Sequence, residues 1–215
     1  MVGISRINIT DKNTGRGVYR FEKSSKMAGA ANKLYRDIFA HLSMPILPGD
    51  ESKDCTKDSF LAGYDYGMGI DVILRMGGGT ELTLQEKFLF TTFNTVTVEY
   101  MQNPSTQERG DWFTCRTQLY FVGYDPLDTG QFANWVLLDW LKVKTLTLQK
   151  KIVWNPPRQN QKDGARANFI YLPMFSFPSE CVLADSRTMY NTTPAARRTP
   201  KEKAKWVFRK LLSSS

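Results

Sequence analysis

The chain has 215 residues, of which 41% are hydrophobic and 13% aromatic, which suits a packed domain and excludes a disordered or fibrous chain. No apolar run approaches the roughly 18 residues of a membrane span, and the first residues lack the apolar stretch of a signal peptide, so we expect a cytoplasmic protein that binds no membrane. The formal net charge of +8 favours a polyanionic partner, of which nucleic acid is the commonest.

The first half of the chain has the apolar pattern of a helix followed by a hairpin. Apolar side chains recur at intervals of three and four over residues 22–42, which predicts a helix. Residues 70–76 form a short apolar run with branched side chains, and residues 81–90 alternate apolar and polar, so both segments are predicted strands. The glycines at 77–79 lie between these segments and can supply the positive φ angles of a tight hairpin.

The second half of the chain alternates strands, loops and short helices. Residues 95–101 are rich in β-branched side chains and predict a third strand, which would continue an antiparallel meander. The sequence then predicts a polar loop at 102–111, strands at 119–122 and 135–140, a short helix at 141–151, a proline-containing loop at 155–168, a strand at 169–177 and a basic helix at 201–212. We expect a single domain over residues 1–215 with an α+β fold, a central mixed β-sheet flanked by helices, and residues 195–215 as a basic C-terminal helix or tail.

Histidine and cysteine chemistry is disfavoured by composition. The cysteines Cys55, Cys115 and Cys181 are far apart, and no pair has the CxxC spacing of a zinc site. With the single histidine His41, a histidine-rich metal site or a Ser-His-Asp triad is hard to build. Catalysis is therefore expected to use carboxylates, amides, lysines and a metal ion.

The strand at 81–90 gathers polar side chains on one face. Thr83, Gln85 and Lys87 are spaced two apart and point the same way, while the intervening residues point the other way. Asp71 lies near the start of the preceding strand, and a hairpin of this length places the start of its first strand near the end of its second. We therefore expect Asp71, Gln85 and Lys87 to meet in one cleft, where a buried lysine would have an anionic partner.

These groups suit the cleavage of a phosphodiester bond. The reaction needs a bound Mg²⁺, or Mn²⁺ in its place, to stabilise charge on the phosphate and to acidify a water molecule. Magnesium prefers oxygen ligands, so we expect Asp71 to supply a carboxylate, Gln85 a side-chain carbonyl and Glu86 its backbone carbonyl. Lys87 is expected to orient the attacking water or to stabilise the transition state.

At these residues the chain resembles the PD-(D/E)xK nuclease superfamily, whose core is a strand carrying an Asp followed by a strand carrying acid-x-Lys. The resemblance rests on GID at 69–71, the glycine hairpin and QEK at 85–87, and it implies a restriction-endonuclease-like core and a prokaryotic or viral nuclease. It implies that Asp71 is the metal-binding acid and Lys87 the catalytic lysine. The chain departs from the family pattern at Gln85, where an acid is usual, and at Ile70, where a proline is usual. The loss of one negative charge at Gln85 leaves the number of bound metal ions open.

Three further acids are candidates for the metal site, each with a structural alternative. Glu99 on the third strand is an extra ligand if its face continues that of Lys87, or otherwise a solvated strand residue. Members of the family often contribute an acid from the first helix, which makes Glu22 and Asp37 candidates. The helix dipole alone also favours a carboxylate at Glu22, and Asp37 is spaced to pair with Lys33.

Basic side chains gather in two segments, around the loop at 155–168 and within residues 195–215. We expect them to contact nucleic-acid phosphates, with solvated surface charges as the alternative. They are Lys150, Lys151, Arg158, Lys162, Arg166, Arg197, Arg198, Lys201, Lys203 and Lys205.

Three hypotheses for the function follow. The first is a Mg²⁺-dependent endonuclease that hydrolyses DNA, for which a homodimer would suit the cutting of both strands. The second is a non-catalytic nucleic-acid-binding protein on the same fold, which the neutral Gln85 supports. The third is a structural or assembly protein whose basic tail contacts nucleic acid incidentally.

Overall fold

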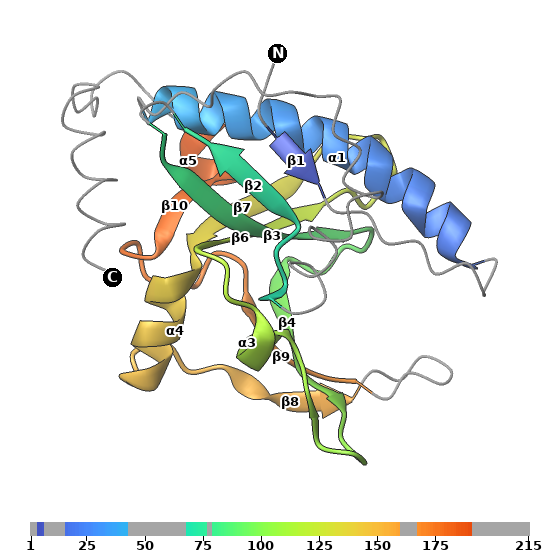
Figure 1. Cartoon of the computed structure of the whole chain (residues 1–215), viewed down its shortest axis with the longest axis vertical. Coiled ribbons are helices and arrows are strands. Elements are labelled where there is room, and N and C mark those ends of the chain that lie inside the picture. The colour runs from blue at the N-terminus through green and yellow to red at the C-terminus, as the bar shows by residue number, and fades with distance from the viewer. Residues whose placement is uncertain (1–3, 7–15, 43–67, 77–78, 160–166, 191–215) are drawn as a thin grey trace.

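The computed structural model describes residues 4–6, 16–42, 68–76, 79–159 and 167–190, with the backbone alone at 4–6, 16–25 and 190. These residues form an α+β fold in three layers, namely a long helix, a mixed six-stranded sheet, and an antiparallel four-stranded sheet accompanied by a short helix (Figure 1). The expected α+β class and mixed central sheet are confirmed. Within the described residues, no helix combines the length and apolar character that crossing a membrane requires.

The six-stranded sheet has the order β1-β2-β3-β6-β7-β10. Its neighbouring strands are antiparallel except for β3 and β6, which run parallel. Parallel neighbours need a long crossover connection, and residues 90–118 supply it. The strands are β1 (Ile4–Arg6), β2 (Val72–Arg75), β3 (Glu81–Leu89), β6 (Leu119–Tyr124), β7 (Asn134–Asp139) and β10 (Val182–Asp185).

The hairpin between β2 and β3 agrees with the sequence prediction. Arg75 pairs with Glu81 at its end, and the Met76 amide donates a hydrogen bond to the Thr80 carbonyl at 2.8 Å. Gly79 has a φ of +80°, a conformation that glycine adopts without steric cost. The hairpin register fixes which residues of β3 lie beside the start of β2.

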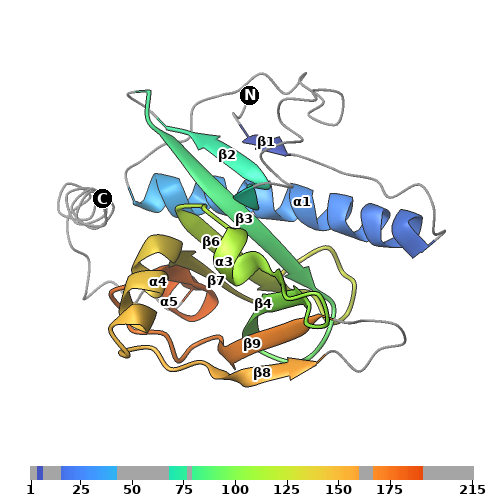
Figure 2. The ribbon, with the colours of Figure 1, turned by 60° about the horizontal axis from the view of Figure 1, so that its bottom comes forward.

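Helix α1 (Arg16–His41) covers one face of the six-stranded sheet (Figures 1 and 2). Its buried side chains pack against the apolar side chains of β2, β3, β6 and β7, and the Tyr35 ring meets the Phe121 ring edge-on at 5.2 Å. Leu82 and Leu84 of β3 belong to this same apolar layer. The predicted helix at 22–42 is confirmed, and the helix begins earlier, at Arg16.

The four-stranded sheet, with the order β5-β4-β9-β8, packs on the opposite face of the six-stranded sheet (Figure 2). Val96 and Val98 of β4 are buried against residues of β6 and β7, such as Val122 and Leu138. Helix α4 covers part of the same face. The elements of this half are β4 (Thr95–Asn103), β5 (Glu108–Arg109), α3 (Asp111–Thr114), α4 (Trp140–Leu148), β8 (Asn155–Gln159), β9 (Asn168–Pro173) and α5 (Ser186–Tyr190).

Several sequence predictions are wrong in this half of the chain. Strand β4 does not continue a meander from β3, because it pairs with β5 and β9 in the second sheet. The predicted loop at 155–168 contains strand β8, whose prolines Pro156 and Pro157 are tolerated because β8 is an edge strand. One flanking layer is a sheet with α4 where helices alone were expected. The predicted basic helix at 201–212 and tail at 195–215 lie outside the described residues.

Candidate functional site

Asp71 and Gln85 are in direct contact across the β2–β3 hairpin. The Asp71 amide donates to the Leu84 carbonyl at 3.0 Å, which extends the ladder by one residue beyond β2. The Asp71 carboxylate then lies beside β3, where its Oδ2 accepts hydrogen bonds from Gln85 Nε2 at 2.6 Å and from the Glu86 amide at 2.7 Å. Two charge-assisted hydrogen bonds hold this carboxylate in place.

The Gln85 side chain is fixed by close packing on its other side. Its Oε1 is buried and, within the described part of the chain, accepts no hydrogen bond. Gly69, with a φ of +60°, lies so close that a Cβ atom there would stand 2.9 Å from this oxygen and 3.2 Å from the Cβ of Cys115. Glycine at position 69 therefore allows both the left-handed backbone and the approach of the Gln85 amide.

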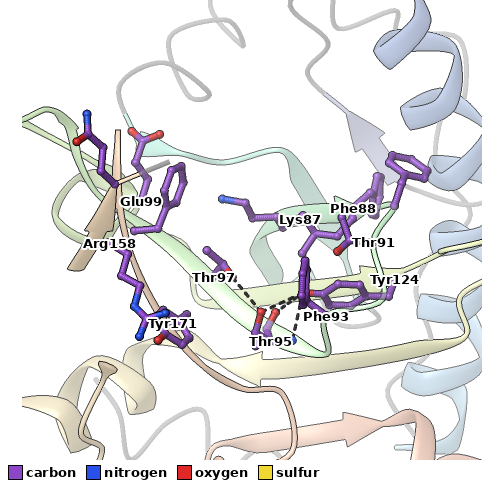
Figure 3. Close-up of a pocket in the computed structure, with 14 residues that line it drawn as sticks. Lys87, Phe88, Thr91, Phe93, Thr95, Thr97, Glu99, Tyr124, Arg158 and Tyr171 are labelled. Carbon is purple, nitrogen blue, oxygen red and sulfur yellow. Dashed lines mark hydrogen bonds between the residues drawn. The ribbon is translucent and has the colours of Figure 1, made fainter. Parts of the chain in front are cut away.

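Lys87 shares the face of Gln85 and points into a cavity between β3 and the second sheet (Figure 3). This cavity, called the Lys87 cavity below, has a volume of about 760 Å³. The Lys87 Nζ lies 5.5 Å from the centre of the Phe169 ring, within range of a cation–π interaction. Residues of β3, β4, β8 and β9 line the cavity, among them Lys87, Thr97, Glu99, Arg158, Phe169 and Tyr171.

Glu99 faces Lys87 from across the Lys87 cavity, as Figure 3 shows. Partial burial raises the pKa of Glu99, the nearby carboxylates of Asp111 and Glu108 raise it further, and the Lys87 ammonium lowers it. The predicted side-chain alternation on β4 is confirmed, because Thr97 and Glu99 line the cavity while the residues between and before them are buried. Glu99 reaches the cavity because β4 belongs to the second sheet, whereas the sequence suggested that β4 would continue a meander from β3.

Tyr120 is a neighbour of this group that the sequence analysis missed. It stands opposite Gln85 in the parallel β3–β6 ladder, and its ring stacks on Trp140 at 4.5 Å. Its hydroxyl is buried and has no hydrogen-bond partner within the described residues. Burial raises the pKa of Tyr120 well above its usual value, and the carboxylates of Asp111, Asp71 and other nearby groups add to the increase.

Asp111, also missed, is brought to this region by tight packing of α3 on β4. It is the first residue of α3, after Gly110. A Cβ atom on Gly110 would stand 2.6 Å from the Glu99 carbonyl oxygen, so only glycine permits this approach. The local signal is the Gly-Asp pair after a polar loop, which is typical of a helix start, and no local pattern shows which strand that start contacts.

Two other acids lie away from the Asp71–Gln85 contact, namely Asp37, a candidate for the metal site, and the side chain of Glu86, for which only the backbone carbonyl was predicted at the site. The Glu86 side chain turns to the opposite face of β3 and accepts a hydrogen bond from the Tyr35 hydroxyl at 2.8 Å, although its backbone lies at the site. Asp37 is exposed on α1, which covers the face opposite Gln85. Glu22 also belongs to α1, in the part whose side chains lie outside the described residues.

The predicted nucleic-acid-binding residues are only partly described. Arg158 lines the Lys87 cavity with its guanidinium 5.2 Å from the centre of the Tyr171 ring. Lys150 and Lys151 are exposed after α4 and do not line the cavity. Those outside the described residues are Lys162, Arg166, Arg197, Arg198, Lys201, Lys203 and Lys205.

The oxygen atoms around Asp71 determine which metal ion this site could bind. Among the described residues, no group of three or more histidine, cysteine, aspartate or glutamate side chains is arranged to hold a metal ion. A set made of one carboxylate, the buried Gln85 oxygen and the Glu86 carbonyl contains amide oxygens instead, and such oxygens are acceptable ligands for Mg²⁺. Gln85 Nε2 lies 2.6 Å from the Asp71 carboxylate and 3.5 Å from the Glu86 carbonyl oxygen, while Oε1 lies on the side of Gly69, so the amide has to turn over for its oxygen to join the other two.

Comparison of the chain with protein-family models, with curated proteins and with solved structures found no match.

Proposed function

We propose that this protein is a metal-dependent phosphodiesterase that cleaves DNA. The observation that carries the proposal is the 2.6 Å contact between Asp71 and Gln85, with Lys87 two residues further along the same face of β3. The carboxylate and the amide are in contact, and the ammonium group of Lys87 lines the Lys87 cavity, which is large enough for part of a substrate; Asp71 and Gln85 are not among the residues that line it. The same groups support the finer proposal of a restriction-endonuclease-like core.

Asp71, the Gln85 amide oxygen and the Glu86 carbonyl would hold the Mg²⁺. The buried Gln85 oxygen that accepts no hydrogen bond supports this set, because a half-turn of the amide would bring it beside Asp71, where a bound cation would satisfy it. When bound, Mg²⁺ supplies charge stabilisation on the phosphate and a more acidic water. Nearby carboxylates, among them Asp111 and Glu99, add negative potential around the Tyr120 hydroxyl, which also favours a cation in this region.

The other roles belong to Lys87 and the Asp71 hydrogen bonds. The Lys87 ammonium would bind a phosphate oxygen and stabilise the charge that develops there. The Gln85 and Glu86 donors keep the Asp71 carboxylate oriented, so little reorganisation is needed when a substrate arrives. Glu99 balances part of the charge of Lys87 before the phosphate enters.

A second candidate function is nucleic-acid binding without cleavage. It is favoured by the direction of the Gln85 hydrogen bond, since the amide nitrogen donates to Asp71 and satisfies it without a cation. A cleavage assay with Mg²⁺ beside a binding assay with EDTA separates the two functions. Binding without cleavage under Mg²⁺ or Mn²⁺ supports this second candidate.

The first prediction tests the proposed cleavage residues. We expect Asp71→Asn and Lys87→Met each to lower the rate of Mg²⁺-dependent DNA cleavage by about a hundredfold or more, because each removes a charge that acts on the phosphate or the metal. The measurement is the initial rate of cleavage of labelled DNA by the purified variants, with binding measured in EDTA.

The matched controls for this experiment lie on the opposite side of the sheet. Asp37→Asn and Lys33→Met remove the same two kinds of charge from exposed positions on α1, and they should cleave DNA as fast as the unaltered protein. Full activity in both Asp71→Asn and Lys87→Met, with cleavage still dependent on Mg²⁺, would contradict the assignment of the site.

A further inference from the structure

The Lys87 cavity combines aromatic surface with positive charge. Phe93, in the connection between β3 and β4, lies at the edge of the cavity and is 71% exposed. Phe169 and Tyr171 of β9 are half-buried in the cavity wall. Cations lie against two of these rings, with Lys87 5.5 Å from the centre of Phe169 and Arg158 5.2 Å from that of Tyr171. An exposed ring at the rim of a cavity is a surface on which another flat group can stack.

Hydroxyl groups form the polar part of the cavity wall. The Tyr124 hydroxyl donates to the Thr95 carbonyl at 2.6 Å, and the Thr95 and Thr97 hydroxyls are 3.2 Å apart, as the dashed lines in Figure 3 indicate. Hydroxyls both donate and accept hydrogen bonds, so they can bind the polar edge of any base. The wall therefore offers stacking and adaptable hydrogen bonding, which are not selective for one base.

The charges favour an anionic ligand. Among the described residues that line the cavity, Lys87 and Arg158 are the cations and Glu99 is the one acid. A nucleotide has the features that this wall matches, namely a flat base and a phosphate.

Duplex DNA presents its phosphates outward and keeps its bases stacked inside, so a ring-lined cavity is reached only by a base that has left the stack. We propose that the Lys87 cavity binds an unpaired nucleobase of a DNA strand, so that single-stranded or flapped DNA is preferred to plain duplex. This inference rests on the proposed cleavage of DNA and adds the substrate class. The phosphate next to the bound base would lie at Lys87, which places the scissile bond near Asp71.

The experiment compares the binding of a labelled single-stranded DNA and of its duplex in EDTA. We expect Phe93→Ala to weaken single-strand binding about tenfold and to change duplex binding less than about twofold, because base stacking on an aromatic ring is removed. Arg158→Lys, which keeps the charge but loses the planar guanidinium, should also weaken single-strand binding selectively. Phe113→Ala, which removes a 40% exposed ring outside the cavity, is the matched control and should leave both affinities unchanged.

The outcomes separate this inference from the proposed cleavage. The inference is overturned if Phe93→Ala binds single-stranded DNA as tightly as the unaltered protein. It is also overturned if Phe113→Ala loses as much single-strand affinity as Phe93→Ala. Both results would count even if Asp71-dependent cleavage is found. A selective loss in Phe93→Ala supports the base-binding cavity even if no cleavage is detected under Mg²⁺. The Phe93 side chain is largely exposed, so its removal should not unfold the protein, and circular dichroism checks this.

Discussion

Asp71 and Gln85 pair one acid with one amide, where the nuclease superfamily that this hairpin resembles usually has two acids. Two carboxylates at 2.6 Å would repel each other unless a cation or proton lay between them, whereas an amide donates a hydrogen bond to the carboxylate. The neutral residue therefore keeps this part of the site ordered in the absence of a metal ion. A divalent cation at the proposed site would have one negative charge fewer to hold it than a pair of acids supplies.

Glu99 provides a prediction on pH dependence. Its pKa is raised from 4.5 in the folded protein, chiefly by burial, so the folded state holds the proton more tightly than the unfolded state. The stability gained from this tighter binding of the proton by Glu99 is fully present below pH 4.5, and it is lost as the pH rises through the folded pKa. We therefore expect Glu99→Gln to be more stable than the unaltered protein at neutral pH, with the difference shrinking towards pH 4.5, as measured by urea unfolding.

The control for Glu99→Gln is Glu180→Gln, which removes a carboxylate from an exposed position. Its stability relative to the unaltered protein should not change over the same pH range. A Glu99→Gln variant whose stability follows that of the unaltered protein at every pH would show that burial does not act on Glu99 as described.

At the scale of elements, the turn before β2 positions the Gln85 amide through Gly69. Gly69 and Gly79 both have positive φ, but a Cβ atom would meet close neighbours only at Gly69. Both Gly69→Ala and Gly79→Ala carry the cost of left-handed backbone, about 1–2 kcal/mol. We expect Gly69→Ala to lose about 1–3 kcal/mol more, because its methyl group displaces Gln85 or Cys115.

Urea unfolding of the two glycine variants provides the measurement. Gly79→Ala serves as the matched control, since it shares the backbone strain without the contact. If both variants lose the same free energy of unfolding, the close packing of Gly69 against Gln85 does not contribute to stability. Cleavage by Gly69→Ala should also fall, since the Gln85 side chain would be displaced.

The β2–β3 hairpin could be predicted from sequence because its signals are local. Alternation on β3 assigned Gln85 and Lys87 to one face, and the glycines marked the turn. The partner of β4 could not be predicted, because Val96 and Val98 give the same alternation whether the strand pairs with β3 or with β9. The contact of Asp111 with β4 was missed for the same reason, since it depends on which strand lies beside α3.

Strand β8 was missed through a different physical effect. Pro156 and Pro157 lack amide protons, so the segment resembled a loop. The β8–β9 pairing shifts register between Asn155 and Arg158, so the two prolines lie at an irregularity of an edge strand, where the ladder does not need their amide donors. Edge position is a property of the whole sheet, so the local sequence could not show it, and Arg158 was expected in a loop when it lies on a strand.

At the scale of the whole molecule, the charge of +8 is concentrated in the last residues of the chain. Residues 196–215 hold seven basic side chains and one acid. If they bind phosphates, a chain that ends at Ala195 should bind DNA with a weaker dependence on salt. We expect the slope of log affinity against log salt to become shallower by about 0.7–0.9 for each phosphate that the shortened chain no longer neutralises.

The control for the shortened chain keeps its length. A full-length variant with every Lys and Arg of residues 196–215 replaced by Gln should show the same shallower slope as the shortened chain, because counterion release depends on charge. An unchanged slope in both proteins would contradict a role for these residues in DNA binding.

The three groups proposed for bond cleavage belong to one hairpin, spanning Asp71 to Lys87, whereas most of the aromatic rings that line the cavity belong to the crossover and to β9. The groups proposed for bond cleavage and most of the rings proposed for base binding therefore come from different parts of the chain. Substitutions in the ring-bearing segments could therefore change which form of nucleic acid the cavity binds, while the Asp71–Lys87 hairpin stays unchanged.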